Sequence, residues 1–91
     1  LHLRGYLIGD IGVKQLVSAL EFNSIVTQLY LCVNDIIDSG RQHLSEYLKL
    51  NSTLTKLNLS DNKIGDRGIQ TLATSLQFNS ALNELDLSWN R

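Results

Sequence analysis

Nucleophilic catalysis in this sequence would have to use Cys32 with either His2 or His43 as its base. A thiol nucleophile needs that base within hydrogen-bond reach. The strands and helices expected below place His43 across the core from Cys32, and they leave the backbones of His2 and Cys32 roughly 8 Å apart. Arg4 lies beside Cys32 and could favour the thiolate, but an ordinary free thiol is the simpler interpretation. We therefore expect that the chain is not an enzyme.

The sequence contains no pattern that is typical of a metal-binding or phosphate-binding site. Cysteine, histidine and carboxylate residues do not occur at the spacings of metal ligands, and there is no glycine-rich loop of the phosphate-binding kind. The recurring acidic residues have another interpretation, as caps that accept hydrogen bonds from the first amides of a helix. They are Asp10, Asp38 and Asp66. We expect no metal ion and no cofactor.

Composition and charge narrow the choice of partner. The chain has a formal net charge of −1 and is 43% hydrophobic, whereas nucleic-acid-binding domains are normally basic. No apolar run approaches the roughly 20 residues of a membrane span. The single cysteine cannot form an internal disulfide, which favours a reducing compartment. We expect no nucleic acid, no membrane and a cytoplasmic location.

A period of 28 residues runs through the whole chain and organises these side chains. Leucines recur at this step, as do isoleucines, aspartates, glycines and asparagines. Examples are Leu1, Leu29, Leu57 and Leu85; Leu3, Leu31, Leu59 and Leu87; Ile8, Ile36 and Ile64; and Asn23, Asn51 and Asn79. Such self-similarity is typical of repeat proteins, in which each unit buries its apolar face against its neighbours. The predicted units are residues 1–28, 29–56 and 57–84, with a partial repeat at 85–91.

The third repeat shows how one unit is expected to fold. Residues 56–60 alternate polar and apolar side chains, as in a strand with one buried face. After a turn, Asp66 caps a helix whose apolar side chains recur at helical spacing from Ile69 to Leu76. Asn79 is expected to end this helix in the left-handed conformation. Because each helix leads back to a strand with the same direction, the sequence predicts a parallel sheet.

The unequal widths of strands and helices predict curvature. Neighbouring strands lie about 4.8 Å apart and packed helices about 8–10 Å apart. The predicted fold is therefore an α/β solenoid segment with its parallel sheet on the concave side and its helices on the convex side. We expect residues 1–91 to form one domain that is a fragment of a longer array.

Two further columns have structural interpretations. Amides just after each strand are expected to bond backbone groups of their own turn and of the neighbouring repeat; they are Asn34, Asn62 and Asn90. Tyr6 replaces them in the first repeat, so the first turn should be built differently, with Gly5 permitting it. Glycines two residues after each cap either allow a helix to approach the sheet closely or are an echo of repeat duplication; they are Gly12, Gly40 and Gly68.

The motif Leu54-x-x-Leu57-x-Leu59-x-x-Asn62-x-Ile64-Gly65-Asp66-x-Gly68 resembles the leucine-rich repeat, in particular its 28-residue ribonuclease-inhibitor-like class. The segments from Val26 to Ile36 and from Leu82 to Asn90 are similar to it as well. The class includes ribonuclease inhibitor and the arrays of NOD-like receptors. The resemblance implies a horseshoe fold, an intracellular setting and protein partners. It implies no functional residue, because members of the class differ at their surface positions.

The polar side chains that alternate with the buried leucines are expected to share the concave strand face. The candidate partner-binding residues are His2, Arg4, Gln28, Tyr30, Cys32, Lys56, Asn58, Ser60, Asp61, Glu84, Asp86, Ser88 and Trp89. Tyr30 and Trp89 are the strongest of these, because exposed aromatic residues dominate interface hot spots. Two alternatives remain open: a merely solvated face, and a Trp89 that covers the end of the array.

The predicted function is non-catalytic protein binding through the concave strand face, as part of an intracellular receptor or scaffold. One alternative is regulation of an enzyme, as an inhibitor of the ribonuclease-inhibitor kind or as a GTPase activator. Another is a structural repeat unit that self-associates through its open ends. The sequence does not identify the protein partner.

Overall fold

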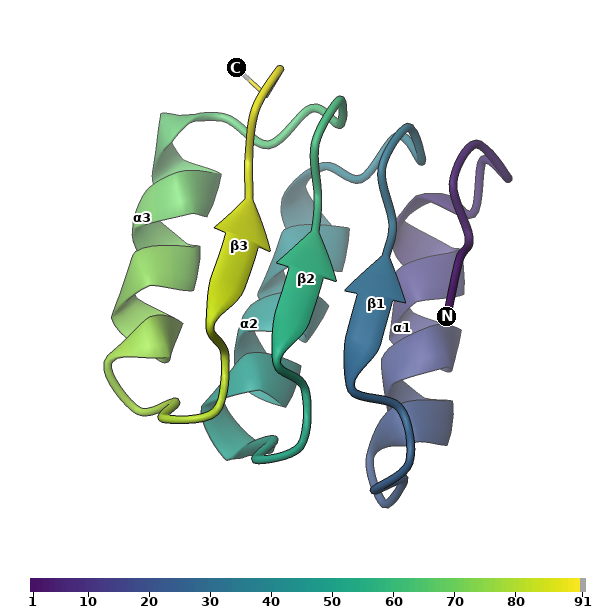
Figure 1. Cartoon of the computed structure of the whole chain (residues 1–91). Helices are drawn as coiled ribbons and strands as arrows, with labels where there is room; N and C mark the ends of the chain where they lie inside the picture. Colours follow the sequence, from purple (N-terminus) through teal and green to yellow (C-terminus); the bar gives the residue numbers. More distant parts are fainter. Residues whose placement is uncertain (91) are drawn as a thin grey trace.

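The computed structural model describes residues 1–90; Arg91 and the side chain of Asp38 lie outside the described part. Within it, strands and helices alternate along the chain (Figure 1). The elements are α1 (Gly9–Leu20), β1 (Gln28–Tyr30), α2 (Asp38–Leu50), β2 (Lys56–Asn58), α3 (Asp66–Leu76) and β3 (Glu84–Asp86). The expected cap at Asp38 depends on that side chain and therefore lies outside the described part.

The strands form a parallel sheet in the order β1-β2-β3. Leu29 pairs with Leu57, and Leu57 pairs with Leu85, so the register of the sheet equals the 28-residue step of the sequence. The first repeat joins the sheet edge through a parallel bridge between His2 and Tyr30. The predicted parallel α/β arrangement is confirmed.

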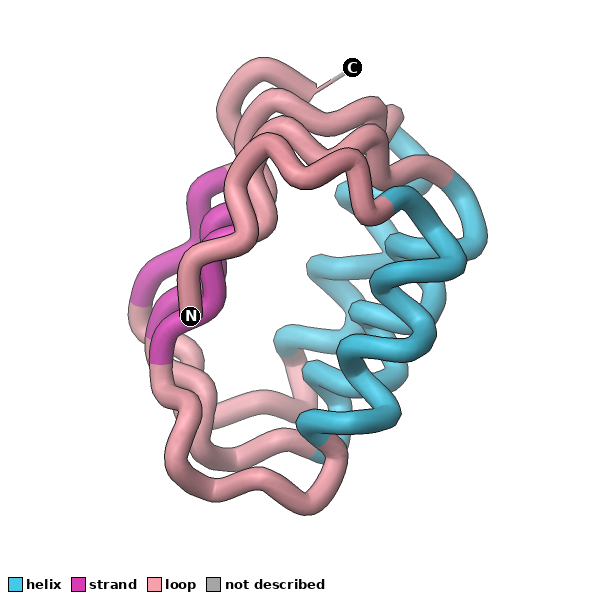
Figure 2. The backbone as a smooth tube through the Cα atoms, turned by 90° about the vertical axis from the view of Figure 1, so that its right-hand side faces the viewer, coloured by secondary structure: helices cyan, strands magenta, loops and turns pink. Residues whose placement is uncertain are grey.

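The sheet and the helices form two layers (Figure 2). Between them lie the side chains of the repeated apolar columns, which burial in the core stabilises by about 1.5–3 kcal/mol each. The fully buried ones include Val13, Leu29, Leu31, Ile36, Leu44, Leu48, Leu54, Leu57, Leu59, Ile64 and Leu72. The alternation predicted for the strands therefore gives one face to the core and the other to solvent.

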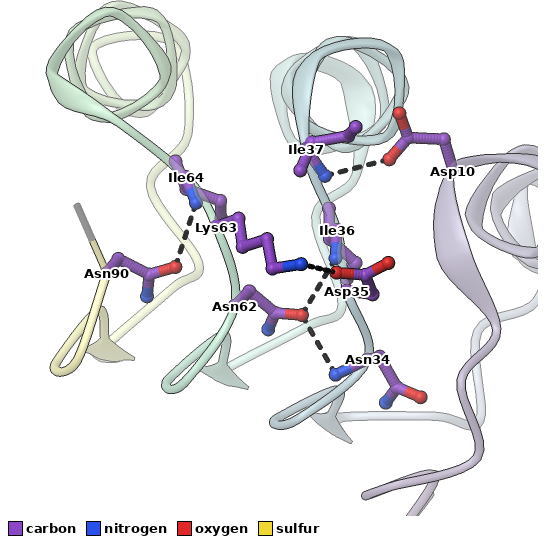
Figure 3. Close-up of polar contacts among 9 residues, drawn as sticks. All are labelled: Asp10, Asn34, Asp35, Ile36, Ile37, Asn62, Lys63, Ile64 and Asn90. Carbon is purple, nitrogen blue, oxygen red and sulfur yellow. Dashed lines mark hydrogen bonds and ion pairs between the residues drawn. The ribbon is translucent and has the colours of Figure 1, made fainter.

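The asparagine ladder forms as predicted (Figure 3). The Oδ1 of Asn62 accepts hydrogen bonds from the amides of Asn34 and Ile36 in the preceding repeat, at 2.9 and 3.0 Å. Its Nδ2 donates to the carbonyls of Leu31 and Leu59, both at 3.0 Å. One buried side chain thus satisfies backbone groups in two repeats, which would otherwise remain unpaired away from water.

Asp10 bonds across repeats, which corrects the prediction that each aspartate caps its own helix. Helix α1 begins at Gly9, and no side chain caps it. Asp10 instead accepts hydrogen bonds from the amide of Ile37 at 2.9 Å and from the amide and hydroxyl of Ser39 at 3.2 and 2.9 Å, at the start of α2. Figure 3 shows the contact with Ile37. Helix α3 likewise has no side-chain cap from Asp66.

The asparagines at the helix ends also differ from the prediction. Asn51 has an extended backbone, with φ −81° and ψ 134°, and Asn79 is not among the described residues with positive φ. The Oδ1 of Asn79 accepts bonds from the amides of Ala81 and Leu82, and its Nδ2 donates to the carbonyl of Leu48 at 2.7 Å. Both asparagines shape the return loop that follows their helix, and Asn79 also ties its loop to the preceding repeat.

The glycine column permits a close approach of side chains rather than of the sheet: an added Cβ would meet the isoleucine four residues earlier and, at Gly40 and Gly68, also a side chain of the preceding helix. A Cβ on Gly40 would collide with the Asp10 carboxylate and would lie 2.9 Å from the Cγ2 of Ile36. A Cβ on Gly68 would collide with Ile64, and it would also meet the Arg41 side chain of α2. A side chain at this position would therefore have to displace the isoleucine before the helix and, at Gly40 and Gly68, a side chain of the preceding helix.

The first turn is built differently, as expected. Gly5, Leu7 and Gly9 have positive φ there, and Tyr6 is exposed where the other repeats bury an amide. Leu7 is an unfavourable residue for this conformation, which costs non-glycine residues roughly 1–2 kcal/mol.

Candidate functional site

The side of the sheet that points away from the helices carries the predicted binding residues, and it is called the outer sheet face below. Its rows run across the strands as expected: Gln28 pairs with Lys56, and Lys56 with Glu84. The next row contains His2, Tyr30, Asn58 and Asp86. All candidates except Cys32 remain at least partly accessible.

Tyr30 occupies the centre of a fixed cluster at the β1 side of this face. The His2 ring stacks on it with centroids 4.2 Å apart and an interplanar angle of 5°. The Nζ of Lys56 lies 5.4 Å from the Tyr30 ring centroid, and the Tyr30 hydroxyl donates to the Oε1 of Gln28 at 3.1 Å. Tyr30 is therefore held in place before any partner arrives, which lowers the entropy cost of binding.

Lys56 links this cluster to β3. Its Nζ lies 3.3 Å from the Oε2 of Glu84, and the Tyr30 hydroxyl and the Glu84 carboxylate both raise the pKa of the ammonium group. Lys56 therefore stays protonated throughout the physiological range. Because this ion pair compensates Glu84, Asp61 and Asp86 are the acidic groups of this face toward the β3 end.

Two adjacent repeats hold their polar side chains in the same way. The Oδ1 of Asn58 accepts bonds from the amide and hydroxyl of Ser60, at 2.9 and 2.7 Å. Asp86 and Ser88 repeat these bonds at the same distances. The Ser88 hydroxyl and amide lower the pKa of the Asp86 carboxyl, so this position presents a carboxylate at neutral pH.

A shallow cavity of about 290 Å³ lies where the strands end. Its lining comprises Arg4, Cys32, Val33, Asn58, Ser60, Asp61, Ser88 and Trp89. The lining backbone turns sharply, since Val33, Asp61 and Trp89 all have positive φ. Trp89 is 81% exposed, and therefore its ring is available to a partner.

Cys32 does not offer the contact surface expected of it. Cys32 is only 9% exposed, and it contributes to the lining of the cavity together with Arg4 and Ser60. Val33, which the sequence interpretation left out of the candidate set, is part of the same lining. The 28-residue step of the sequence aligns Val33 with Asp61 and Trp89, and this alignment could have identified it as a candidate.

The structure places Cys32 and the two histidines in different surroundings. His43 lines a cavity between α1 and α2, whereas Cys32 lies at the sheet, and the ring of His2 stacks on Tyr30. Among residues 1–90, with Asp38 set aside, histidine, cysteine and carboxylate side chains form no group of three or more that could hold a metal ion. No described helix has the length and apolar character needed to cross a membrane.

A second surface was missed by the sequence interpretation. Three large apolar residues follow the 28-residue step at the C-terminal ends of the helices, and all are exposed. They are Phe22, Leu50 and Phe78, called the apolar row below. The period was visible in the sequence, but only columns that point to the core or to the strand face were considered.

Comparisons with known proteins agree with the repeat. Residues 50–73 match the family model described as Leucine Rich repeat, which supports a leucine-rich repeat in this chain. No curated protein matches the chain. Among solved structures, 21 chains match. One is described as "Leiomodin-1 Actin-Binding Site 2 (ABS2)", with a TM-score of 0.88 and 28% sequence identity over 97% of this chain. This chain spans 53% of the length of that one.

These matches, with the observed fold, indicate a small α/β domain of the leucine-rich-repeat type and suggest a protein-binding module.

Proposed function

We propose that this chain is a non-catalytic leucine-rich-repeat module of the ribonuclease-inhibitor-like class, which binds a protein partner through its outer sheet face. The 28-residue register of the sheet supports the class. In a longer array of such units this face would be concave, because the helix layer is wider than the strand layer.

The observation that carries the proposal is the preorganised aromatic surface. Tyr30 is clamped between His2 and Lys56, and Trp89 stands exposed at the rim of the cavity on the same face. Tyrosine and tryptophan are enriched in interface hot spots, where truncation costs at least about 2 kcal/mol. Carboxylates at Asp61 and Asp86 favour a partner that brings basic groups to the β3 end.

Actin is our candidate partner, because the similar structure is described as an actin-binding site. The assignment rests on that description and on the polar, aromatic character of the outer sheet face. It is a statement about this segment alone, since the similar chain is about twice as long.

Binding to purified monomeric and filamentous actin tests both the proposed partner and the proposed binding face. We expect Tyr30→Ala and Trp89→Ala each to raise the Kd at least about tenfold, as measured by fluorescence titration and by cosedimentation with filaments. Gln15→Ala, on an exposed position of α1, is the matched control and should bind like the wild type. No binding of the wild type would exclude actin, and an unchanged Kd in both aromatic variants would exclude this face.

A further inference from the structure

We infer that the cavity at the strand ends receives an arginine side chain of the protein partner, between Trp89 and Asp61, and that an acidic residue of the same partner segment pairs with Arg4. This inference deepens the proposed function and rests on its claim that the outer sheet face binds a protein. It specifies the chemistry of the contact and the direction in which the partner's charges run across the sheet.

The rim of the cavity is built at a backbone position that favours glycine. The first repeat has Gly5 there, with φ 74°, and the following repeats have Val33, Asp61 and Trp89, with φ 58°, 56° and 59°. Side chains are disfavoured in this left-handed region, β-branched ones most of all. Residues held in such conformations cluster at functional sites, and all three of these line the cavity. The strained positions therefore point to a role for their side chains.

Two opposite charges of the cavity lining are uncompensated. Arg4 comes from the first repeat and Asp61 from the turn after β2, and both side chains are exposed. Neither forms an ion pair within residues 1–90. The lysines of the same strand and turn, Lys56 and Lys63, are each paired with another carboxylate. A partner therefore meets Arg4 and Asp61 as unpaired charges.

These two charges belong to different ends of the face. The amide of Asp61 donates to the carbonyl of Ser88 at 2.9 Å, so Asp61 and Trp89 occupy neighbouring turns. Arg4 belongs to the first repeat, which pairs with β1 at the opposite side of the sheet. At about 4.8 Å per strand, its backbone lies roughly 10 Å from that of Asp61 and roughly 14 Å from that of Trp89. The face is therefore positive at the first repeat and negative toward β3.

A second carboxylate reinforces the negative end. The Oδ1 of Asp86 accepts hydrogen bonds from the amide and hydroxyl of Ser88, at 2.9 and 2.7 Å, and Ser88 itself lines the cavity. The Oδ2 of Asp86 accepts no hydrogen bond from the described part of the chain. This oxygen is therefore open to a cation that enters beside Trp89.

An exposed tryptophan near a carboxylate selects a guanidinium group. The faces of aromatic rings attract cations, and the indole of tryptophan does so most strongly. The planar guanidinium of arginine can stack on the Trp89 ring while its donors bind a carboxylate in a two-pronged contact. The ammonium group of lysine is a compact, strongly hydrated charge that offers no such plane. Trp89 and Asp61 together therefore fit arginine better than lysine.

The distance between the two ends sets the spacing of charges in the partner. A position between Asp61 and Trp89 lies about 12 Å from Arg4 along the sheet. In an extended segment, residues four positions apart share one side and lie about 13 Å apart. An arginine and a glutamate at this spacing can therefore occupy both ends of the face together.

The chain carries its own probe for this test, because Trp89 is its only tryptophan. The ligand is an extended peptide of serine and threonine with one arginine and a glutamate four residues away, made in both sequence directions. Trp89 fluorescence should give a Kd for the tighter of the two at least about fivefold lower than with glutamine in place of arginine. With lysine in place of arginine, the Kd should be at least about twofold higher.

Substitutions in the protein assign the two contacts, with binding followed by nuclear magnetic resonance. Asp61→Asn removes the charge but keeps a residue that tolerates positive φ, and it should weaken binding at least about threefold. Arg4→Gln should weaken binding of the peptide that carries glutamate and leave that of the version with glutamine unchanged. Glu21→Gln removes a carboxylate at the end of α1 and should have no effect.

The inference about the cavity fails if the arginine peptide does not bind, or if it binds no better than the glutamine or lysine version. It also fails if Glu21→Gln weakens binding as much as Asp61→Asn, since net charge would then explain the loss. An unchanged affinity in Arg4→Gln overturns the pairing with the acidic residue. Actin binding that Tyr30→Ala weakens, without any preference for the arginine peptide, would overturn the inference and leave the proposed function intact. Preference for the arginine peptide without actin binding would do the reverse for actin.

Discussion

The Ser45 hydroxyl is buried in α2, and among the described residues it has no hydrogen-bond partner. Serine stands here in the column that has Val17 in the first repeat and Ala73 in the third. A buried hydroxyl without a partner costs about 1–3 kcal/mol. We therefore expect Ser45→Ala to raise the free energy of unfolding by about 1 kcal/mol in urea denaturation.

Ser75 provides the matched control in α3. Its hydroxyl is equally buried, but it donates to the carbonyl of Thr71 at 3.2 Å. Ser75→Ala should leave stability unchanged or lower it. Equal gains from both substitutions would show that helix propensity, not the unpaired hydroxyl, produces the effect.

The Asp10 carboxylate makes stability depend on pH. Burial raises its pKa, but hydrogen bonds from Ile37, Ser39 and Gly40 outweigh this and hold the pKa below the ordinary 3.8. A carboxyl with a lowered pKa in the folded state stabilises the fold above its unfolded pKa, and this contribution is lost as pH falls through the folded value. Asp10→Asn should therefore be less stable than the wild type by about 1 kcal/mol at neutral pH.

Measuring the stability of both proteins over a series of pH values distinguishes this charge effect from a loss of side-chain packing. The stability difference between the wild type and Asp10→Asn should shrink as the pH falls below 3.8. Asp66→Asn is the control at the equivalent position, since Asp66 accepts no hydrogen bond from the described residues and α3 has no side-chain cap. A stability difference that stays constant from neutral to acidic pH would show that the charge of Asp10 does not stabilise the start of α2.

At the scale of the elements, the asparagine ladder holds neighbouring turns together. Asn62 lies inside the stack and serves two amides of the preceding repeat, whereas the Oδ1 of Asn90 serves the amide of Ile64. Asn62→Ala leaves buried backbone groups without a hydrogen-bond partner, in a place that water cannot reach. It should lower the free energy of unfolding by about 3 kcal/mol or more.

The comparison variant is Asn90→Ala, which should cost less because Asn90 is only half-buried at the sheet edge. Thermal unfolding followed by circular dichroism measures both. An equal loss in the two variants would mean that neither the deeper burial of Asn62 nor its second amide partner adds to the cost of removing a ladder amide.

The elements also show what the sequence could and could not reveal. The columns of leucine predicted the strands, the parallel direction and the register, because a fixed step leaves one way to stack the units. Asp10 was assigned to its own helix because sequence rules for caps consider residues within a few positions. Its partners lie 27 to 29 residues away, and they become neighbours only when the repeats stack.

Site residues were less predictable than elements. Alternation placed Tyr30 and Trp89 on the outer sheet face, but it could not reveal that His2 and Lys56 clamp Tyr30, since those contacts depend on side-chain rotamers. The burial of Cys32 was missed as well, because alternation assigns a residue to a face but does not show how far its neighbours cover it. Charge counting likewise overlooked the pairing of Lys56 with Glu84.

At the scale of the whole molecule, two surfaces face different directions on one small scaffold. The outer sheet face is polar and aromatic, and it is held rigid by hydrogen bonds within the sheet layer. The apolar row lies at the helix ends. The two surfaces differ in chemistry, so the effect of substitutions on one can be compared with the effect of substitutions on the other.

The most direct test of the central claim is a crossed pair of double variants, both titrated with actin. Tyr30→Ala/Trp89→Ala removes the aromatic contacts of the outer sheet face, and Phe22→Ala/Phe78→Ala removes an equal number of aromatic rings from the helix-end edge. We predict that the first pair raises the Kd at least about tenfold and that the second leaves it unchanged. Unchanged binding in the first pair, or an equal loss in both, would contradict docking through the sheet.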